Sequence, residues 1–192
     1  MVLLLVVVVV LPLLPLLITQ DWGWWQAWTW AALASLGFVL SRVVVARKHP
    51  DLIRERADTF THAGVKGWDQ LLAPLMAIGS MLPPVVAALQ RLWQPVAFGV
   101  PTNLAGAALV VAGYVLGTLA MWHNRFFSGQ VRIQHERGHR VVSAGTYRWV
   151  RHPGYVGTLL AELGLPLILD SGWAWFAVAA VGAVTVVRTA LE

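Results

Sequence analysis

One short stretch of this chain has the residue types needed to bind a polar small molecule. Residues 145–157 read Gly-Thr-Tyr-Arg-Trp-Val-Arg-His-Pro-Gly-Tyr-Val-Gly and lead directly into an apolar run. The rings of Tyr147 and Tyr155 could hold a cation such as a sulfonium, which gains about 0.5–2 kcal/mol over an aromatic face. Pro153 favours the first turn of a helix, whose free N–H groups can bind a carboxylate. The spacing therefore indicates a pocket for a polar, partly cationic ligand.

Two other interpretations of this region compete with a ligand pocket. A basic loop at a membrane surface could simply extend its arginines into the lipid headgroups. A zinc site would use His135 and His139, which are four residues apart. However, Gly138 interrupts a helix between them, and the chain has no cysteine. We therefore expect no metal site, and the pocket and the interfacial loop remain as alternatives at this point.

The composition defines the elements that must position this stretch. The chain has 192 residues, of which 58% are hydrophobic and only 12% are charged. In soluble domains about a quarter of the residues are charged, so this composition predicts an integral membrane protein. The formal net charge is +5. We expect no nucleic-acid partner, because no basic soluble domain is present to bind one.

The apolar runs predict the fold class. A helix needs about 20 apolar residues to cross a bilayer. We expect an all-α, polytopic membrane helix bundle with five to six transmembrane helices, in which a polar cofactor-binding segment precedes a C-terminal helical hairpin. The first run is broken by Pro12 and Pro15, and the third is kinked by Pro83 and Pro84. The runs cover residues 2–18, 25–46, 70–92, 102–122, 154–169 and 172–189.

The charge distribution predicts the orientation in the membrane. In or around the connections after the second and fourth runs lie 12 of the 14 basic residues, counting Arg42 near the end of the second run. Because Lys and Arg collect in cytoplasmic loops, both connections and both chain ends are expected in the cytoplasm. Five crossings result if the first run or the hairpin does not fully span. We expect a multi-pass protein of a prokaryotic inner or plasma membrane, with its active site facing the cytoplasm.

A set of motifs in fixed order carries a family resemblance. Residues 124–128, 131–134, 138–142, 145–148 and 151–157 resemble the isoprenylcysteine carboxyl methyltransferase family. These are integral-membrane, S-adenosylmethionine-dependent methyltransferases, grouped with phospholipid N-methyltransferases. Residues 49–56 and 67–69 resemble the loop of its prokaryotic members. The resemblance covers residues 47–192 of a single domain, 1–192, and leaves 1–46 as an N-terminal transmembrane pair.

The resemblance implies specific roles for residues of this chain. Arg188 would face the methyl acceptor, and Glu192, four residues later on the same helix face, would lie at the cofactor. The family pattern continues beyond this glutamate, so we expect the chain to be truncated after Glu192. Thr146 stands where a proline is common. The expected S-adenosylmethionine contacts are Gln134, His139, Arg140, Val141, Val142, Tyr147, His152, Pro153, Gly154, Tyr155 and Glu192.

The expected reaction is methyl transfer from S-adenosylmethionine to a lipophilic or lipidated acceptor that enters from the bilayer. Carboxyl O-methylation of an isoprenylcysteine-like group fits the resemblance best, with Arg188 orienting the carboxylate. An amine acceptor would need a base, for which His152 and Glu192 are candidates. Glu162 lies inside an apolar run, and an intramembrane acid is a candidate functional residue. We assign it to substrate binding.

Two other functions stay open. Membrane reductases of similar architecture bind NADPH, and Arg148 with Arg151 could bind its 2′-phosphate. A non-enzymatic lipid-binding or scaffold protein would bind neither cofactor. A direct comparison of S-adenosylmethionine with NADPH binding separates the three functions.

Overall fold

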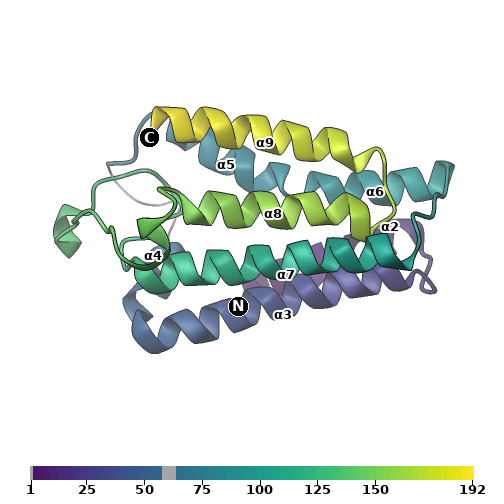
Figure 1. Cartoon of the computed structure of the whole chain (residues 1–192), viewed down its shortest axis with the longest axis horizontal. Helices are drawn as coiled ribbons and strands as arrows, with labels where there is room; N and C mark the ends of the chain where they lie inside the picture. The colour runs from purple at the N-terminus through teal and green to yellow at the C-terminus, as the bar shows by residue number, and fades with distance from the viewer. Residues whose placement is uncertain (1, 58–63) are drawn as a thin grey trace.

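The chain forms a bundle of roughly parallel and antiparallel helices, with loops and short helices gathered at one end (Figure 1). The computed structural model describes residues 2–57 and 64–192. Within these ranges all regular structure is helical. The elements are α1 (Val2–Leu5), η1 (Val6–Val10), α2 (Leu11–Thr19), α3 (Trp25–Lys48), α4 (Pro50–Ala57), α5 (Asp69–Gly79), α6 (Leu82–Trp93), α7 (Val100–His123), η3 (His135–Arg137), η4 (Gly145–Arg148), α8 (Pro153–Ile168) and α9 (Ala174–Leu191).

The predicted membrane fold is confirmed. Among the described residues, four stretches are long and apolar enough to cross a bilayer: Trp25–Lys48, Asp69–Trp93, Val100–His123 and Ala174–Leu191. Val6–Thr19 and Pro153–Ile168 are shorter apolar helices. The number of crossings, five or six, therefore stays a prediction. Each expected apolar run coincides with a helix, and the third is broken between α5 and α6. The predicted break of the first run at Pro12 and Pro15 is wrong, because α1, η1 and α2 follow one another without a gap and α2 continues through both prolines.

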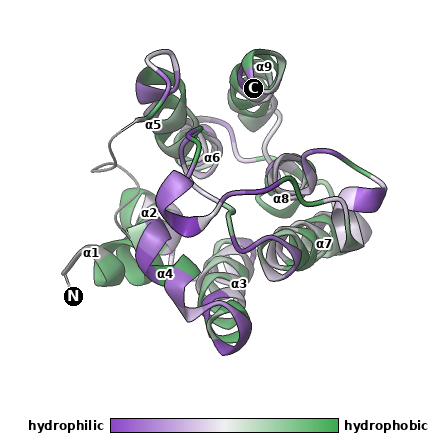
Figure 2. Ribbon diagram, turned by 90° about the vertical axis from the view of Figure 1, so that its left-hand side faces the viewer, coloured by the Kyte–Doolittle hydropathy of each residue, from purple (hydrophilic) through white to green (hydrophobic). Residues whose placement is uncertain are grey.

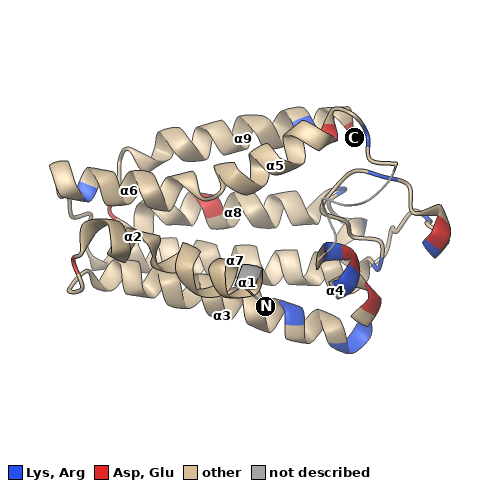
Figure 3. Ribbon diagram, turned by 180° about the vertical axis from the view of Figure 1, so that it is seen from behind, with Lys and Arg blue, Asp and Glu red and all other residues tan. Residues whose placement is uncertain are grey.

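Charge separates the two ends of the bundle. Most Lys and Arg positions gather at the end that holds α4 (Figure 3). Seen from this end, α4 and the connecting segments are hydrophilic, whereas the helices behind them are largely hydrophobic (Figure 2). Arg91 lies at the other end, where its Nε and Nη2 atoms donate to Asp21 Oδ2 over 2.9 and 2.7 Å. This ion pair gives Arg91 a counter-charge at the end opposite most of the other basic residues.

Prolines shape the third apolar stretch as expected. Helix α5 ends at Gly79, and α6 restarts at Leu82 with prolines in its first turn. A proline cannot donate a backbone hydrogen bond, so it is tolerated at a helix start and disrupts a helix interior. The break brings Ser80 and Met81 to the wall of an internal cavity.

Glycines let α7 and α8 pack closely in antiparallel orientation. A Cβ atom built on Gly106 would lie 2.7 Å from the carbonyl oxygen of Gly164. One built on Gly113 would collide with the carbonyl oxygen of Gly157. Such small residues allow helix backbones to approach within a membrane. The two glycine pairs therefore set the position of α8, whose first turns carry the ligand-binding stretch predicted from the sequence.

A polar network fixes the end of the bundle opposite α4. The Asp170 carboxylate accepts hydrogen bonds from Gln26 Nε2 and Asn103 Nδ2, both over 2.7 Å, and from the Phe98 N–H over 3.0 Å. These contacts join α3, α7 and the turn between α8 and α9. Because the described polar groups satisfy one another here, the network stabilises the bundle.

Candidate active site

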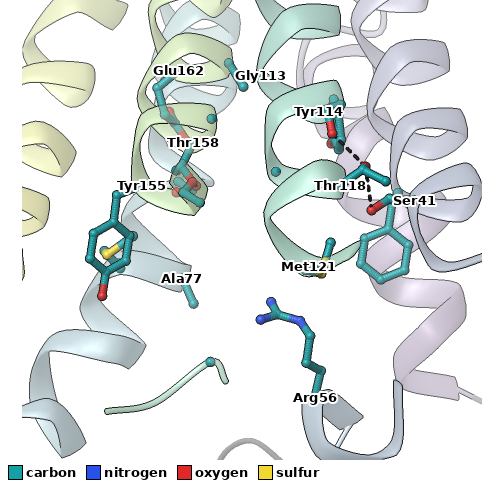
Figure 4. Close-up of a pocket in the computed structure, with 18 of the residues that line it drawn as sticks. Ser41, Arg56, Ala77, Gly113, Tyr114, Thr118, Met121, Tyr155, Thr158 and Glu162 are labelled. Carbon is teal, nitrogen blue, oxygen red and sulfur yellow. Dashed lines mark hydrogen bonds between the residues drawn. The ribbon is translucent and has the colours of Figure 1, made fainter. Parts of the chain in front are cut away.

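A cavity of about 500 Å³ lies inside the bundle near the end that holds α4. Helix α8 forms one wall with Tyr155, Thr158 and Glu162, and the α7 side carries Tyr114 and Thr118 opposite (Figure 4). Residues 127–129, from the segment between α7 and α8, also line it. A cavity of this size, mostly apolar with a few convergent polar groups, is typical of a small-molecule site.

Ion pairs with α4 hold the segment between α7 and α8 in place. The Arg132 guanidinium donates to both carboxylate oxygens of Glu55 over 2.8 and 2.9 Å. One turn earlier, Asp51 accepts from Arg137 Nη2 over 2.5 Å. The hydrogen bond from Arg137 holds the pKa of the Asp51 carboxyl below its usual value. Residues 49–56, which in the sequence stood out only for their resemblance to a family loop, thus hold the segment between α7 and α8 against α4.

Arg188 lies in the cavity wall and is held by a buried aspartate. Its Nε donates to Asp69 Oδ1 over 2.6 Å, and its Nη2 donates to Asp69 Oδ2 over 3.0 Å. Nη2 also donates to the Gly129 carbonyl over 2.8 Å. Asp69 Oδ2 accepts a further hydrogen bond, 2.6 Å long, from the Val131 N–H. Nη1 lies 3.6 Å from the sulfur of Met76.

Tyr155 links Arg188 to the C-terminal glutamate. The Tyr155 hydroxyl donates to Glu192 Oε2 over 2.8 Å. The His152 ring stacks on the Tyr155 ring, with centroids 5.4 Å apart and an interplanar angle of 9°. His152 Nδ1 lies 3.6 Å from the same Glu192 oxygen. The Arg188 guanidinium carbon lies 5.5 Å from the centroid of the Tyr155 ring. Four predicted site residues thus form one cluster.

Three guanidinium groups line the cavity: those of Arg42, Arg56 and Arg188. Arg42 packs over the Phe38 ring at 4.4 Å and donates to the sulfur of Met121. It forms no ion pair within the residues that the structure describes. Burial lowers the pKa of Arg56 to about 9, and the positive charges of Arg42 and Arg188 add to this effect. Arg42, Arg56 and Arg188 thus place three guanidinium groups in the wall of this part of the cavity.

Other predicted cofactor residues lie away from the cavity wall. The buried Gln134 amide donates to the Phe126 carbonyl over 2.7 Å and accepts from Arg137 over 2.5 Å. The His139 ring stacks on Phe126, with centroids 5.0 Å apart. Arg140 and Val141 are exposed, and Val142 is half-buried. The structure does not bring these five residues to the cavity, and their cofactor role stays a prediction.

Tyr147 and the start of α8 lie closer to the cluster. Asn124 Nδ2 donates to the Tyr147 hydroxyl over 3.3 Å, and burial raises the pKa of that hydroxyl. Pro153 is buried at the first position of α8. A Cβ atom on Gly154 would lie 2.5 Å from the Phe127 ring, so this glycine makes room for a protein side chain. The start of α8 at Pro153 confirms the helix start predicted from the sequence.

Three residues of the site were not predicted from the sequence: Asp69, Arg42 and Arg56. Asp69 begins an apolar helix, where an acid usually only interacts favourably with the helix dipole, so nothing marked it as a partner of Arg188. Arg42 carried a usable signal, because it lies inside the predicted second span, where a charge suggests function. Arg56 was read only as part of a basic cytoplasmic loop.

The helices and the cavity define a membrane helix bundle with a polar site at one end, and comparison with known proteins gives the family resemblance. Residues 106–192 match the family model described as "Isoprenylcysteine carboxyl methyltransferase (ICMT) family". The resemblance inferred from the motifs is confirmed for this part of the chain. The match begins at residue 106, so the assignment of residues 47–105 to the same family region stays a prediction.

Curated relatives have consistent names. A probable protein-S-isoprenylcysteine O-methyltransferase of Oryza sativa subsp. indica is 37% identical over 68 residues, 35% of this chain and 36% of the relative. Protein-S-isoprenylcysteine O-methyltransferase of Saccharomyces cerevisiae is 37% identical over 68 residues, 35% of this chain and 28% of the relative. Each alignment thus spans about a third of the relative. These relatives are plant and yeast proteins, so the prediction of a prokaryotic-type member is not borne out. No solved structure matches the chain.

Proposed function

We propose that this protein transfers a methyl group from S-adenosylmethionine to a lipophilic acceptor at the cytoplasmic face of a membrane. One observation carries the proposal: Tyr155 contacts Glu192 through its hydroxyl and Arg188 through its ring. The cluster therefore joins the residues assigned to the cofactor with the residue assigned to the acceptor. The names of the relatives, which are O-methyltransferases, support the same reaction class.

The residues around Tyr155 fit S-adenosylmethionine chemically. When bound, this cofactor supplies an electrophilic methyl group on a sulfonium. The stacked rings of His152 and Tyr155 offer aromatic faces to a cation, and the Glu192 carboxylate offers a hydrogen-bond acceptor. We propose that these three residues hold the cofactor, together with Tyr147, Pro153 and Gly154. Gln134 and residues 139–142 would complete the binding surface.

The cationic wall supports a carboxylate acceptor. Asp69 and Gly129 fix two nitrogens of Arg188, so the guanidinium has little freedom to reorient. Arg42 and Arg56 add positive charge to the same cavity. A carboxylate is already a nucleophile, so none of these side chains has to remove a proton. Their contribution is to orient the acceptor, an effect that can supply about 7–11 kcal/mol of rate acceleration.

An isoprenylcysteine carboxylate is the acceptor that the relatives' names suggest. The three arginines of the cavity wall could bind its carboxylate. Trp30, Leu165 and Met81 line the part deeper in the bundle. An amine acceptor would instead require a base, and His152 beside Glu192 would be in position to act as one.

Calorimetry with purified protein tests this proposal against the two alternatives. We expect S-adenosylmethionine to bind and NADPH not to bind. Substitution His152→Ala should weaken S-adenosylmethionine binding about 5- to 10-fold, because the ring stacked on Tyr155 is lost. Tighter binding of NADPH would favour the reductase, and binding of neither would favour a non-enzymatic protein. Unchanged affinity in His152→Ala would remove that residue from the cofactor site.

A further inference from the structure

Glu162 is a carboxyl group in the deeper wall of the cavity, inside α8. Its side chain is 5% exposed. It projects from the same face of α8 as Tyr155 and Thr158 (Figure 4). Seven residues along an α-helix are two turns, so Glu162 lies about 10 Å further into the bundle than Tyr155. The membrane interior around it makes an unsatisfied carboxyl oxygen costly.

The hydrogen bonds of Glu162 are incomplete. Ser80, at the break between α5 and α6, makes a side-chain hydrogen bond to it. The other oxygen, Oε2, is buried and has no hydrogen-bond partner among the residues described. The nearby hydroxyls are already engaged with backbone carbonyls: Thr158 donates to Gly154 over 3.1 Å, and Tyr114 donates to Ala34 over 3.3 Å. Glu162, a residue of the cavity wall, therefore has one carboxyl oxygen that no described residue satisfies.

A purely structural carboxyl would not be expected to remain in this state. Elsewhere in the bundle the buried acids are fully paired, as Asp69 is with Arg188 and Val131 and Asp170 is with Gln26, Asn103 and Phe98. Glu162 differs from both because its unused oxygen belongs to a residue of the cavity wall. A hydrocarbon chain lying beside it would leave this oxygen unsatisfied.

We propose that the preferred acceptor carries a hydroxyl or amine group about 10 Å from the carboxylate that is methylated, and that Glu162 Oε2 accepts a hydrogen bond from this group. The inference rests on the proposed function, because it uses the same cavity and takes its cationic end as the site of the reacting group. Glu162 is then a specificity-determining residue, and an unmodified isoprenyl tail is a poorer ligand than a tail with a polar substituent.

Binding measurements with a matched pair of ligands test the proposal. The probes are S-farnesylcysteine and the same molecule with a hydroxyl on its middle isoprene unit. Both are titrated into the purified, folded chain without S-adenosylmethionine, and quenching of tryptophan fluorescence reports occupancy because Trp30 lines the cavity. We expect the hydroxylated probe to bind about 2- to 10-fold more tightly, the range for one net hydrogen bond.

Variants connect this preference to Glu162. Substitution Glu162→Leu should abolish the preference for the hydroxylated probe, and Glu162→Met serves the same purpose if the leucine variant does not fold. The control is Thr158→Val, which lines the same cavity but removes a hydroxyl already bonded to Gly154, and it should keep the preference. Equal affinity of the two probes for the wild type, or an intact preference in Glu162→Leu, would overturn the inference. Because no cofactor is present, failure of the methyltransferase proposal would be detected separately, as absence of S-adenosylmethionine binding.

Discussion

Arg188 and Asp69 form an ion pair that is almost completely buried, with side-chain exposures of 6% and 0%. The pair joins the last turn of α9 to the first turn of α5, across 119 residues of sequence. Asp69 also accepts the Val131 N–H, so one carboxylate connects two helices with the segment between α7 and α8. The position of Arg188 in the cavity wall therefore depends on a residue that lies outside the part of the chain matched to the family.

Breaking this pair should destabilise the fold. Substitution Asp69→Asn leaves a buried guanidinium without its counter-charge, which costs about 3–5 kcal/mol. We expect a large decrease in the thermal unfolding midpoint in detergent, and partial recovery in the double variant Asp69→Leu with Arg188→Met. Asp51→Asn is the control, because that carboxylate is 43% exposed and should matter much less. Equal decreases of the unfolding midpoint in Asp69→Asn and Asp51→Asn would show that the buried pair contributes no more to stability than the exposed one.

Arg188 should affect the acceptor more than the cofactor. Arg188→Lys keeps a positive charge beside Asp69 but loses the planar fork that contacts Asp69 and the cavity together. We expect kcat/KM for the acceptor to fall about 10- to 100-fold, as for loss of a charge-assisted hydrogen bond. Calorimetry should give an S-adenosylmethionine Kd close to that of the wild type. A comparable loss in both quantities would move Arg188 to the cofactor site.

The hydroxyl of Tyr155 provides a test of the cofactor wall. Tyr155→Phe removes the 2.8 Å hydrogen bond to Glu192 and retains the ring beside His152 and Arg188. Since Glu192 is partly exposed, we expect a modest loss of S-adenosylmethionine affinity, about 3- to 10-fold. Tyr114→Phe removes another hydroxyl from a cavity residue and should leave that affinity unchanged. The same loss in both variants would indicate a general effect on packing.

Two glycines of α7 make a matched pair for the packing of α8. Gly113→Ala would force a methyl group into the backbone of α8 at Gly157 and should cost about 1–3 kcal/mol of stability. Gly117→Ala, one turn later, meets no atom within 4 Å. It should be neutral or stabilise by up to about 1 kcal/mol through helix propensity. Thermal unfolding of both variants checks this contrast, and similar midpoints would contradict the close packing described here.

The Asp51–Arg137 contact predicts a pH dependence of stability. The hydrogen bond from Arg137 lowers the pKa of the Asp51 carboxyl in the folded state. The contact's contribution to folding stability is therefore fully present above roughly pH 4, the pKa of Asp51 in the unfolded chain. It is lost as the pH falls through the lower pKa of Asp51 in the folded protein. Asp51→Asn should remove this part of the acid sensitivity of the unfolding midpoint. If the unfolding midpoint of Asp51→Asn falls with decreasing pH as it does in the wild type, Asp51 does not contribute to the acid sensitivity of stability.

The helices were largely predictable from the sequence because they coincide with apolar runs, four of which are long enough to cross a bilayer. The turn at Asp170 and the break before Pro83 follow from the same signals. The family resemblance, rather than local chemistry, implied that Arg188 and Glu192 act together with Tyr155 and His152. Spacing of four residues places Arg188 and Glu192 on one face of α9.

The contacts that position these residues could not be predicted in this way. Pairing of Asp69 with Arg188 and of Glu55 with Arg132 depends on how distant helices meet, which no periodicity encodes. The 94% exposure of Val141 could not be predicted either, because an apolar residue in a motif suggests burial. Arg42 could have been predicted as a site residue, because a charge within a predicted membrane span by itself suggests a functional role.

Methyl transfer itself is the most direct test of the account. The folded wild-type chain, in lipid nanodiscs, is incubated with S-adenosylmethionine labelled in its methyl group and with S-farnesylcysteine. We predict that the label appears as a base-labile methyl ester, and that the yield falls sharply in Arg188→Lys. Absence of labelled product from the wild type, both with this acceptor and with a total lipid extract, would contradict the proposed function.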